Sequence, residues 1–376
     1  MHMTMSIRIF VCLLALAASC AGDAAAQFRK YSNEFLNIGA GARGLAMGGA
    51  QVAVADDGTA GYWNPAGLME VKDRPILHLM HAGYFSGIGK YDYASAALPA
   101  TDGRRALGVT LLRFAIDDIP NTLYLVEPDG TINYNNIRSF SSADYAFLLS
   151  YAQRIVEEEH RSISFGVNAK VIHRSVGSFA RAWGFGLDAG LRIRWHNWRL
   201  GATLRDVTTT FNAWSFSFTE REKEVLYLTK NDIPVKSTEL TAPRLILGFA
   251  RDLRIGDRFR ITPEMDLDFT FDGKRNVLLS GQPVSIDPRL GIEAGYRDVI
   301  MLRAGISNFQ QGLKDGDTLN VRKAWIFQPS LGAGFRWSGF SVDYAFSNLA
   351  NQSNPLYSHV FSLRVPLGRA NRNPIR

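Results

Sequence analysis

The chain has 376 residues, a formal net charge of +7 at pH 7 and a hydrophobic content of 46%. Its Lys and Arg residues are spread among Asp and Glu rather than clustered, so the basic balance does not indicate a nucleic-acid-binding protein. Outside the N-terminus, no apolar run reaches the roughly 18 residues that mark a membrane-spanning helix, which excludes a helical membrane protein.

Residues 1–26 predict a cleaved signal peptide, because the apolar core Ile9–Ala18 is followed by the small residues Ala24–Ala26. Cys20 offers a lipoprotein processing site as an alternative, although alanine stands three residues before it, where leucine is usual. Cleavage after residue 26 would remove Cys12 together with Cys20. The mature chain would then have no thiol and no disulfide.

Residues 27–74 do not alternate as strands do. Small residues dominate from Ile38 to Ala55, which lets the backbone pack closely against other backbone or against a lumen wall. Further on, Pro65 fixes its own φ and disfavours a helical conformation at Asn64. We therefore predict a short helix from Pro65 to Met69, with Asn64 as its N-cap.

This segment also resembles a known family. Its small-residue run, acidic pair and aromatic turn look like the N-terminal signature of the PorV/PorQ outer-membrane proteins, which are similar in turn to the FadL-type transporters of hydrophobic compounds. The resemblance implies a fourteen-stranded barrel in which residues 27–74 fold inside the lumen as a plug. The residues that carry the plug motif are Asp56, Asp57, Trp63, Asn64, Pro65 and Gly67.

Residues 75–367 predict an all-β fold, a transmembrane antiparallel β-barrel of about 14 strands, followed by a C-terminal tail at 368–376. From Trp183 to Trp195, and again from Phe259 to Phe271, apolar and polar side chains alternate with the period of a strand. These segments have the roughly 9–11 residues that cross a tilted wall, with aromatic residues at both ends. The alternative, a soluble β protein, has strands of about 5–6 residues.

The predicted connections sort by length. The connections after even-numbered strands are short, such as His196–Asn197. In outer-membrane barrels, short turns of this kind face the periplasm, whereas long loops face the outside of the cell. A signal peptide with this pattern predicts the bacterial outer membrane. The connections after odd-numbered strands are mostly long and include Ala115–Ser141, Asp206–Ala242, Asp272–Ile286 and Phe309–Ala324.

The predicted loop Asp206–Ala242 is unusually apolar for a loop. Loops of this composition either fold over the barrel mouth or contact a partner. Aromatic residues are favoured where surfaces bind proteins. The candidate partner-binding residues are Phe211, Trp214, Phe216, Phe218 and Tyr227.

Several charged residues are expected to face the lumen. Glu264, Asp266 and Asp268 share one face of a predicted strand. They would either form a cation-attracting stripe or, as we favour, pair with basic side chains or with the plug. The candidate luminal charges are Arg192, Arg194, Glu264, Asp266, Asp268 and Arg289.

No arrangement of histidines indicates catalysis or a metal site. His78 and His81 lie at odd spacing on the first predicted strand, so they face opposite sides of the wall and cannot bind one metal ion together. We therefore predict neither an enzyme nor a bound cofactor or metal.

The resemblance favours a non-enzymatic component or cargo-binding shuttle of a type IX protein secretion system. Its partners would be the translocon barrel, the C-terminal domains of secreted cargo, and outer-membrane lipid and lipopolysaccharide. The alternative is a FadL-like transporter, in which apolar loops capture a hydrophobic ligand and a movable plug passes it on. A third possibility is a structural barrel without a small ligand.

Overall fold

The computed structural model describes residues 27–28, 32–72, 74–127, 129–234, 236–313, 323–347 and 358–368. The predicted signal peptide and residues 369–376 of the predicted tail lie outside these ranges. Most of the predicted loop Phe309–Ala324 also lies outside them.

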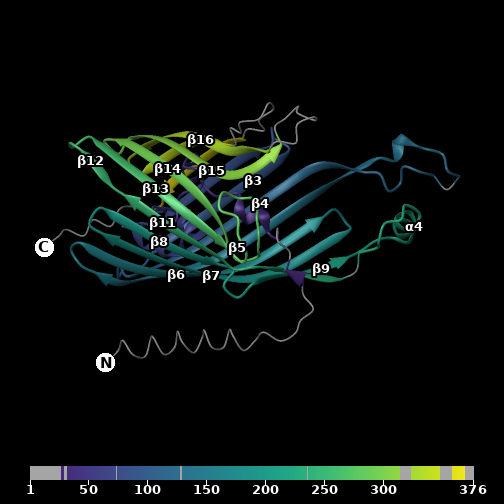
Figure 1. Ribbon diagram of the computed structural model, residues 1–376, viewed down its shortest axis with the longest axis horizontal. Helices are drawn as coiled ribbons and strands as arrows, with labels where there is room; N and C mark the ends of the chain where they lie inside the picture. Colours follow the sequence, from purple (N-terminus) through teal and green to yellow (C-terminus); the bar gives the residue numbers. More distant parts are fainter. Residues whose placement is uncertain are drawn as a thin grey trace, which may run out of the picture.

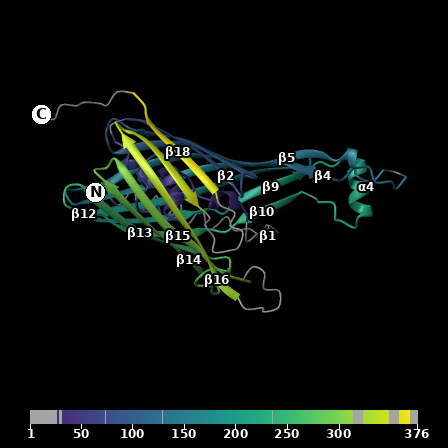
Figure 2. The same ribbon diagram turned by 90° about the horizontal axis from the view of Figure 1, so that it is seen from above.

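The described strands form one closed antiparallel barrel, which confirms the predicted fold (Figure 1). Strand β18 lies beside β2 and pairs with it from His359–Gly83 to Pro366–Ile76, which closes the sheet (Figure 2). The first six strands of the wall, in chain order, are β2 (Ile76–Tyr84), β3 (Gly89–Pro99), β4 (Arg105–Asn121), β5 (Arg138–Glu157), β6 (Arg161–Val176) and β7 (Ala180–Trp195). The others are β8 (Trp198–Arg205), β9 (Thr210–Phe216), β10 (Ser237–Thr241), β11 (Arg244–Arg251), β12 (Leu253–Ile255), β13 (Phe259–Thr270), β14 (Ser285–Tyr296), β15 (Ile300–Leu313), β16 (Lys323–Trp337), β17 (Phe340–Ser347) and β18 (Ser358–Pro366).

Two wall strands are interrupted. Strand β7 pairs with both β8 and β9, so these two are successive parts of one wall strand. Strand β10 pairs with β9 and β11 pairs with β8, so β10, β11 and β12 form the next one. Counted in this way, the wall has 14 strands.

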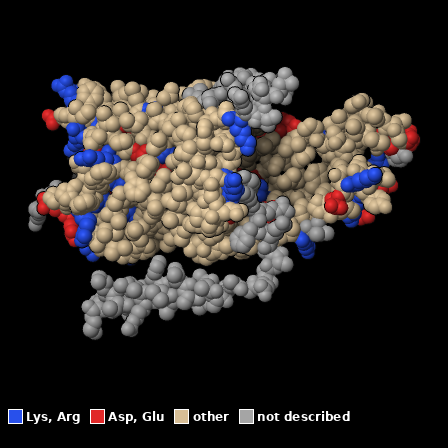
Figure 3. All heavy atoms as spheres, in the orientation of Figure 1, with Lys and Arg blue, Asp and Glu red and all other residues tan. Residues whose placement is uncertain are grey.

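Side chains alternate between the lumen and the outer surface as predicted. On β7, Trp183, Phe185 and Leu187 are exposed, whereas Gly184 and Asp188, at alternate positions, are buried. The same split holds along β13 and β18. The outer wall is therefore apolar over its middle, and charged side chains gather toward the two ends of the visible face, as a membrane-spanning barrel requires (Figure 3).

The predicted loop boundaries were partly wrong. Strand β4 continues to Asn121 and β5 begins at Arg138, so both ends of the predicted loop Ala115–Ser141 are strand and only residues 122–137 connect them. The regular alternation of apolar and polar residues ends there, and a wall strand that rises above the membrane needs no apolar outer face. The connections after the first and fifth wall strands, residues 85–88 and 177–179, are short turns rather than long loops.

The predicted loop Asp206–Ala242 also contains wall. Strands β9 and β10 lie within it, and only residues 217–236 connect them. This connection contains helix α4 (Glu220–Leu228), which lies with the β4–β5 hairpin well beyond the rest of the barrel (Figures 1 and 2).

The N-terminal segment lies inside the barrel. Its elements are η1 (Glu34–Asn37), α2 (Ala42–Ala46), α3 (Ala60–Trp63) and η2 (Pro65–Glu70), while β1 (Gln27–Phe28) pairs in parallel with β10. Helix α2 contacts β15 to β18, and η2 contacts β3 to β7 on the other side of the lumen. None of the described helices is long and apolar enough to cross a bilayer.

The predicted helix after Asn64 is confirmed, as the 3-10 helix η2. Asn64 is extended and its side-chain oxygen accepts a hydrogen bond from the Ala66 amide, while Pro65 occupies the first turn. Glycines on the facing strands make room for it, because a Cβ at Gly166 or Gly190 would collide with Pro65 or Asn64.

Candidate functional site

An apolar pocket of about 400 Å³ lies on the inner face of the tall side of the wall. On β9, Trp214 and Phe216 point inward because they alternate with the outward-facing Phe211 and Ser215. The pocket is lined by Leu123, Val176, Phe179, Ala180, Trp214, Phe216, Phe218, Ser237 and Glu239.

The aromatic lining is ordered by ring contacts. Phe179, in the turn before β7, stacks on Phe218 with ring centroids 5.9 Å apart and meets Phe140 edge to face at 5.2 Å. Trp214 and Phe216 stack with a centroid distance of 6.2 Å. These contacts come from three separate segments of the chain, so the tertiary fold rather than one loop builds the pocket.

The pocket has a polar floor. The guanidinium of Arg174 lies 5.1 Å from the ring of Trp214, a cation–π contact, and donates to Asp144 over 2.9 Å. It also lies 3.7 Å from a carboxylate oxygen of Glu239. Ser32, at the start of the described plug segment, donates to Glu239 over 3.5 Å. The pocket therefore ends at a charged layer that separates it from the lumen below.

The five predicted loop residues do not form one surface. Trp214 and Phe216 lie on a wall strand, and with Phe218 they line the pocket. Phe211 lies on the same strand but faces outward and is 45% exposed. Tyr227 lies on α4, is 77% exposed and is not part of the pocket lining. The sequence showed that aromatic residues are frequent in this segment. It did not show that a strand runs through the segment and points some of these residues inward and others outward.

Helix α4 packs on the β4–β5 hairpin rather than on the barrel mouth. Thr219 and Glu222 form a capping box at its start. Tyr124, from the hairpin, donates to Glu222 over 3.1 Å, and Arg221 donates to the Val126 carbonyl over 3.1 Å. The helix and hairpin thus form one projecting unit.

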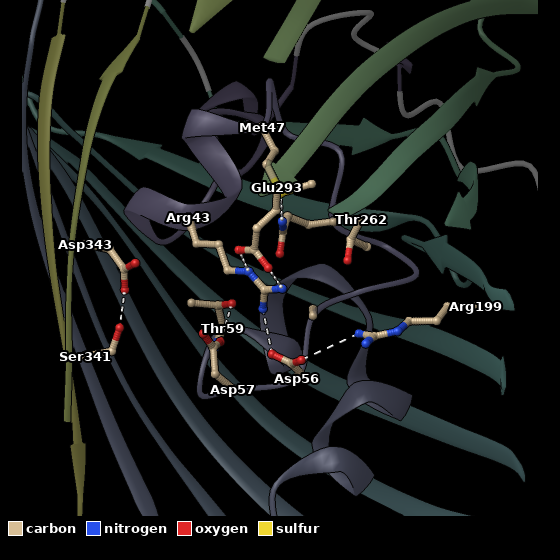
Figure 4. Close-up of polar contacts among 12 residues, drawn as sticks. Arg43, Met47, Asp56, Asp57, Thr59, Arg199, Thr262, Glu293, Ser341 and Asp343 are labelled. Carbon is tan, nitrogen blue, oxygen red and sulfur yellow. Dashed lines mark hydrogen bonds and ion pairs between the residues drawn. The ribbon is translucent and has the colours of Figure 1, made fainter. Parts of the chain in front are cut away.

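In the lumen, a network of charges joins the N-terminal segment to the wall (Figure 4). Arg43 donates two hydrogen bonds to Glu293 on β14, over 2.9 and 3.0 Å, and a third to Asp56 over 2.6 Å. Arg303 on β15 donates to Glu293 and to Asp343, both over 2.7 Å. Because the members are largely buried, each charge depends on its partners.

The acidic pair of the plug motif faces two different partners. Burial alone would raise the pKa of Asp56, but the guanidinium groups of Arg43 and Arg199 hold it well below its usual range. Asp57 instead accepts from the amide and hydroxyl of Thr59, over 2.7 and 2.6 Å, and lies 3.8 Å from His78 on β2.

The other motif residues are buried against the wall. The Trp63 ring nitrogen donates to the Ala40 carbonyl over 2.8 Å. The Asn64 amide donates to the carbonyls of Val52 and of Leu191 on β7, both over 3.0 Å. At Gly67, any Cβ would collide with the Ala55 carbonyl oxygen, so only glycine fits there without movement.

The three carboxylates on β13 have different partners. Glu264 accepts from the Ala53 amide over 2.8 Å, and Asp266 accepts from the Gln51 and Val52 amides over 2.9 and 3.1 Å. Asp268 pairs with Arg244 and, over 2.9 Å, with Arg289. The structure therefore places two of them against the backbone of the N-terminal segment and one against arginines, rather than in an open stripe.

The two arginines of β7 also contact the N-terminal segment. Arg192 is buried and donates to the Ala55 carbonyl. Arg194 lies 3.7 Å from Glu70 at the lower end of the segment. His78 faces inward and His81 outward, as the spacing predicts. Within the described ranges, no group of three or more His, Cys, Asp or Glu side chains could hold a metal ion.

No family model and no curated protein matches the sequence. Solved structures do match. The toluene transporter TodX of P. putida has a TM-score of 0.53 at 14% identity, covering 88% of this chain and 99% of that one. The toluene transporter TbuX of Ralstonia pickettii gives 0.51 at 14% identity over 88% and 99%, and the monoaromatic hydrocarbon channel CymD gives 0.50 at 14% over 87% and 97%.

At this identity the likeness shows the fold alone. The chain has the FadL-like barrel fold of these hydrocarbon transporters and channels. The comparisons give no specific support for the PorV/PorQ family, which the N-terminal motif resembles.

Proposed function

We propose that this chain is an outer-membrane barrel that captures a hydrophobic small molecule in the apolar pocket at its mouth and passes it inward. The observation that carries the proposal is the pocket itself. Its volume of about 400 Å³ lies in the range of roughly 300–1,000 Å³ typical of ligand sites, and its lining is almost entirely aliphatic and aromatic. Transfer of apolar surface from water into such a lining is favourable.

The fold and the pocket's orientation support the same proposal. The similar structures are described as toluene transporters and a monoaromatic hydrocarbon channel, and such molecules are small, flat and apolar. The pocket faces the inside of the barrel mouth, above the N-terminal segment, rather than the lipid. A captured molecule would therefore stand at the entrance to the lumen.

A matched pair of substitutions tests this proposal. Trp214→Ala removes an inward ring of the pocket, and Phe211→Ala removes an outward ring from the same strand. We expect Trp214→Ala to weaken toluene binding to the purified barrel about tenfold or more, because a buried aromatic contact contributes roughly 1.5–3 kcal/mol. Phe211→Ala should bind toluene as the wild type does. Equal affinities in both variants would contradict the proposal.

A second candidate function, a component of a type IX secretion system, is favoured by the projecting unit of α4 and the β4–β5 hairpin. This unit exposes large apolar side chains far from the membrane, where neither folding nor lipid requires them: Tyr134, Tyr227 and Leu228 are 72%, 77% and 70% exposed. Exposed apolar groups of this kind suit contact with a protein.

Deleting residues 211–228 would not test the secretion candidate, because the deletion removes a wall strand. The double substitution Tyr227→Ser and Leu228→Ser leaves the wall and the pocket intact. Under this candidate it should reduce both the secretion of cargo and the recovery of a translocon barrel with the tagged protein. If the variant secretes and co-purifies as the wild type does, the projecting unit is not a cargo or translocon site.

A further inference from the structure

A second cavity, of about 530 Å³, opens above the N-terminal segment and has a different chemistry from the apolar pocket. Glu34 and Asn37 of η1 line this vestibule, whereas Ser32, just before η1, contacts Glu239 in the floor of the apolar pocket. The N-terminal segment therefore lies between the two. The vestibule floor includes Gly48 and Gly49, which follow α2.

Side-chain amides and hydroxyls are more numerous in the vestibule wall than charged side chains. Each amide offers two N–H donors and a carbonyl acceptor, and each hydroxyl both donates and accepts. A ligand that presents many hydroxyl groups matches such a wall, while a hydrocarbon offers these groups no hydrogen bond. The residues concerned are Asn37, Asn308, Gln310, Gln328, Ser307 and Ser330.

The charges of the vestibule do not select an anion. Arg244 and Arg289 in its lining both pair with Asp268, and Arg275 pairs with Asp272. Asp287 and Glu34 add two further carboxylates to the lining. The arginines are therefore matched by acidic groups, so the site fits a neutral ligand.

Buried polar atoms without partners border the same cavity. The Tyr84 hydroxyl and the Ser347 hydroxyl form no hydrogen bond within the described part of the chain, although their residues are only 4% and 5% exposed. One carboxylate oxygen of Asp287 is likewise buried and forms no hydrogen bond with the described residues. Unpaired buried polar groups are uncommon in folded proteins. Neighbouring protein atoms cover these three oxygens, so they add polar character to the border of the cavity rather than contacts open to a ligand.

Aromatic rings complete the site. Tyr84 and Phe85, at the end of β2, and Trp63 from the N-terminal segment border the cavity. A sugar ring has polar edges and C–H faces, so it suits a wall that combines amides with aromatic surfaces.

We propose that the vestibule binds a neutral polyhydroxylated ligand of the oligosaccharide class. The site is separate from the apolar pocket and does not depend on the uptake of a hydrophobic molecule. It would take a glycan from outside, or the glycan part of a larger molecule, above the N-terminal segment.

Calorimetric titration of the full-length barrel tests the proposal. The protein is purified in an amine-oxide detergent, which carries no sugar head group, and titrated with maltotriose, cellotriose and chitotriose. At least one of them should bind. The double substitution Gln310→Leu and Gln328→Leu should weaken that binding about tenfold, as the loss of two hydrogen bonds implies.

Gln311→Leu is the matched control, because this residue neighbours Gln310 but does not line the vestibule. It should bind the trisaccharide as the wild type does. Absence of binding by all three sugars at millimolar concentration would overturn the proposal, as would equal binding by the wild type and the double variant. Toluene binding measured on the same samples shows whether the variant barrel is intact, and it tests the hydrophobic pocket separately.

Discussion

At the scale of single residues, Arg43 shows how the N-terminal segment is held in place. Its guanidinium binds a carboxylate of its own segment, Asp56, and one of the wall, Glu293. No local sequence pattern indicates the contact with Glu293, because 250 residues separate it from Arg43. Charged residues on inward-facing positions could be recognised by strand alternation, but their partners depend on how the wall closes.

Arg43→Met should destabilise the protein by about 3–5 kcal/mol, because it leaves two acidic groups without their shared partner. The urea dependence of tryptophan fluorescence would measure the change, since the buried Trp63 lies in the same segment. Arg105→Met is the control. Its ion pair with Asp102 lies in an exposed turn, so little change is expected. A loss for Arg43→Met as small as that for the control would contradict the network's role.

At the scale of elements, the alternation of side chains along a strand correctly predicted which residues face the outside of the barrel and which face the lumen. It placed Trp183 outside and Asp188 inside, and it separated His78 from His81. It failed above the membrane, where β4, β5 and β9 continue beyond the predicted ends of the strands. The signal that identifies a strand in lipid is the apolar outer face, and this signal is lost where the wall meets water.

Helix η2 was predictable because its signals are local, namely an N-cap and a proline in the first turn. The position of η2 in the lumen was not predictable, because it depends on glycine residues in the strands that face it. A Cβ at Gly190 would meet both the Asn64 side chain and the Pro65 ring.

Gly190→Ala should therefore displace the start of η2, at a cost of about 1–3 kcal/mol typical of overpacking. The displaced segment should be cleaved faster by trypsin at Arg43. Gly295→Ala serves as the control, because the nearest atom to its added Cβ is 3.8 Å away. Cleavage at equal rates in both variants would show that the close approach at Gly190 does not hold the segment.

At the scale of the whole molecule, we propose that the N-terminal segment obstructs the route from the mouth. The apolar pocket and the vestibule both lie above it, and helix α2 and helix η2 contact strands on opposite sides of the lumen. Passage of a molecule through the lumen therefore requires the segment to move.

A disulfide tests this requirement. A Cβ at Gly61 of α3 would lie 3.8 Å from the Cβ of Ser150 on β5, a typical separation for a disulfide. The oxidised Gly61→Cys and Ser150→Cys variant should still bind toluene at the mouth but should no longer take it up into cells. A reductant should restore uptake. Uptake by the oxidised form at the rate of the reduced form would exclude movement of α3 during passage.

The central claim is that the pocket on the inner face of the tall wall holds a small apolar molecule. Crystals of the protein soaked with bromobenzene would test it directly, because the bromine gives an anomalous signal that locates the ligand. We expect an anomalous peak among Phe179, Trp214 and Phe218 in crystals of the wild type, and no peak there in Trp214→Ala crystals. A peak elsewhere in the barrel, with none in this pocket, would contradict it.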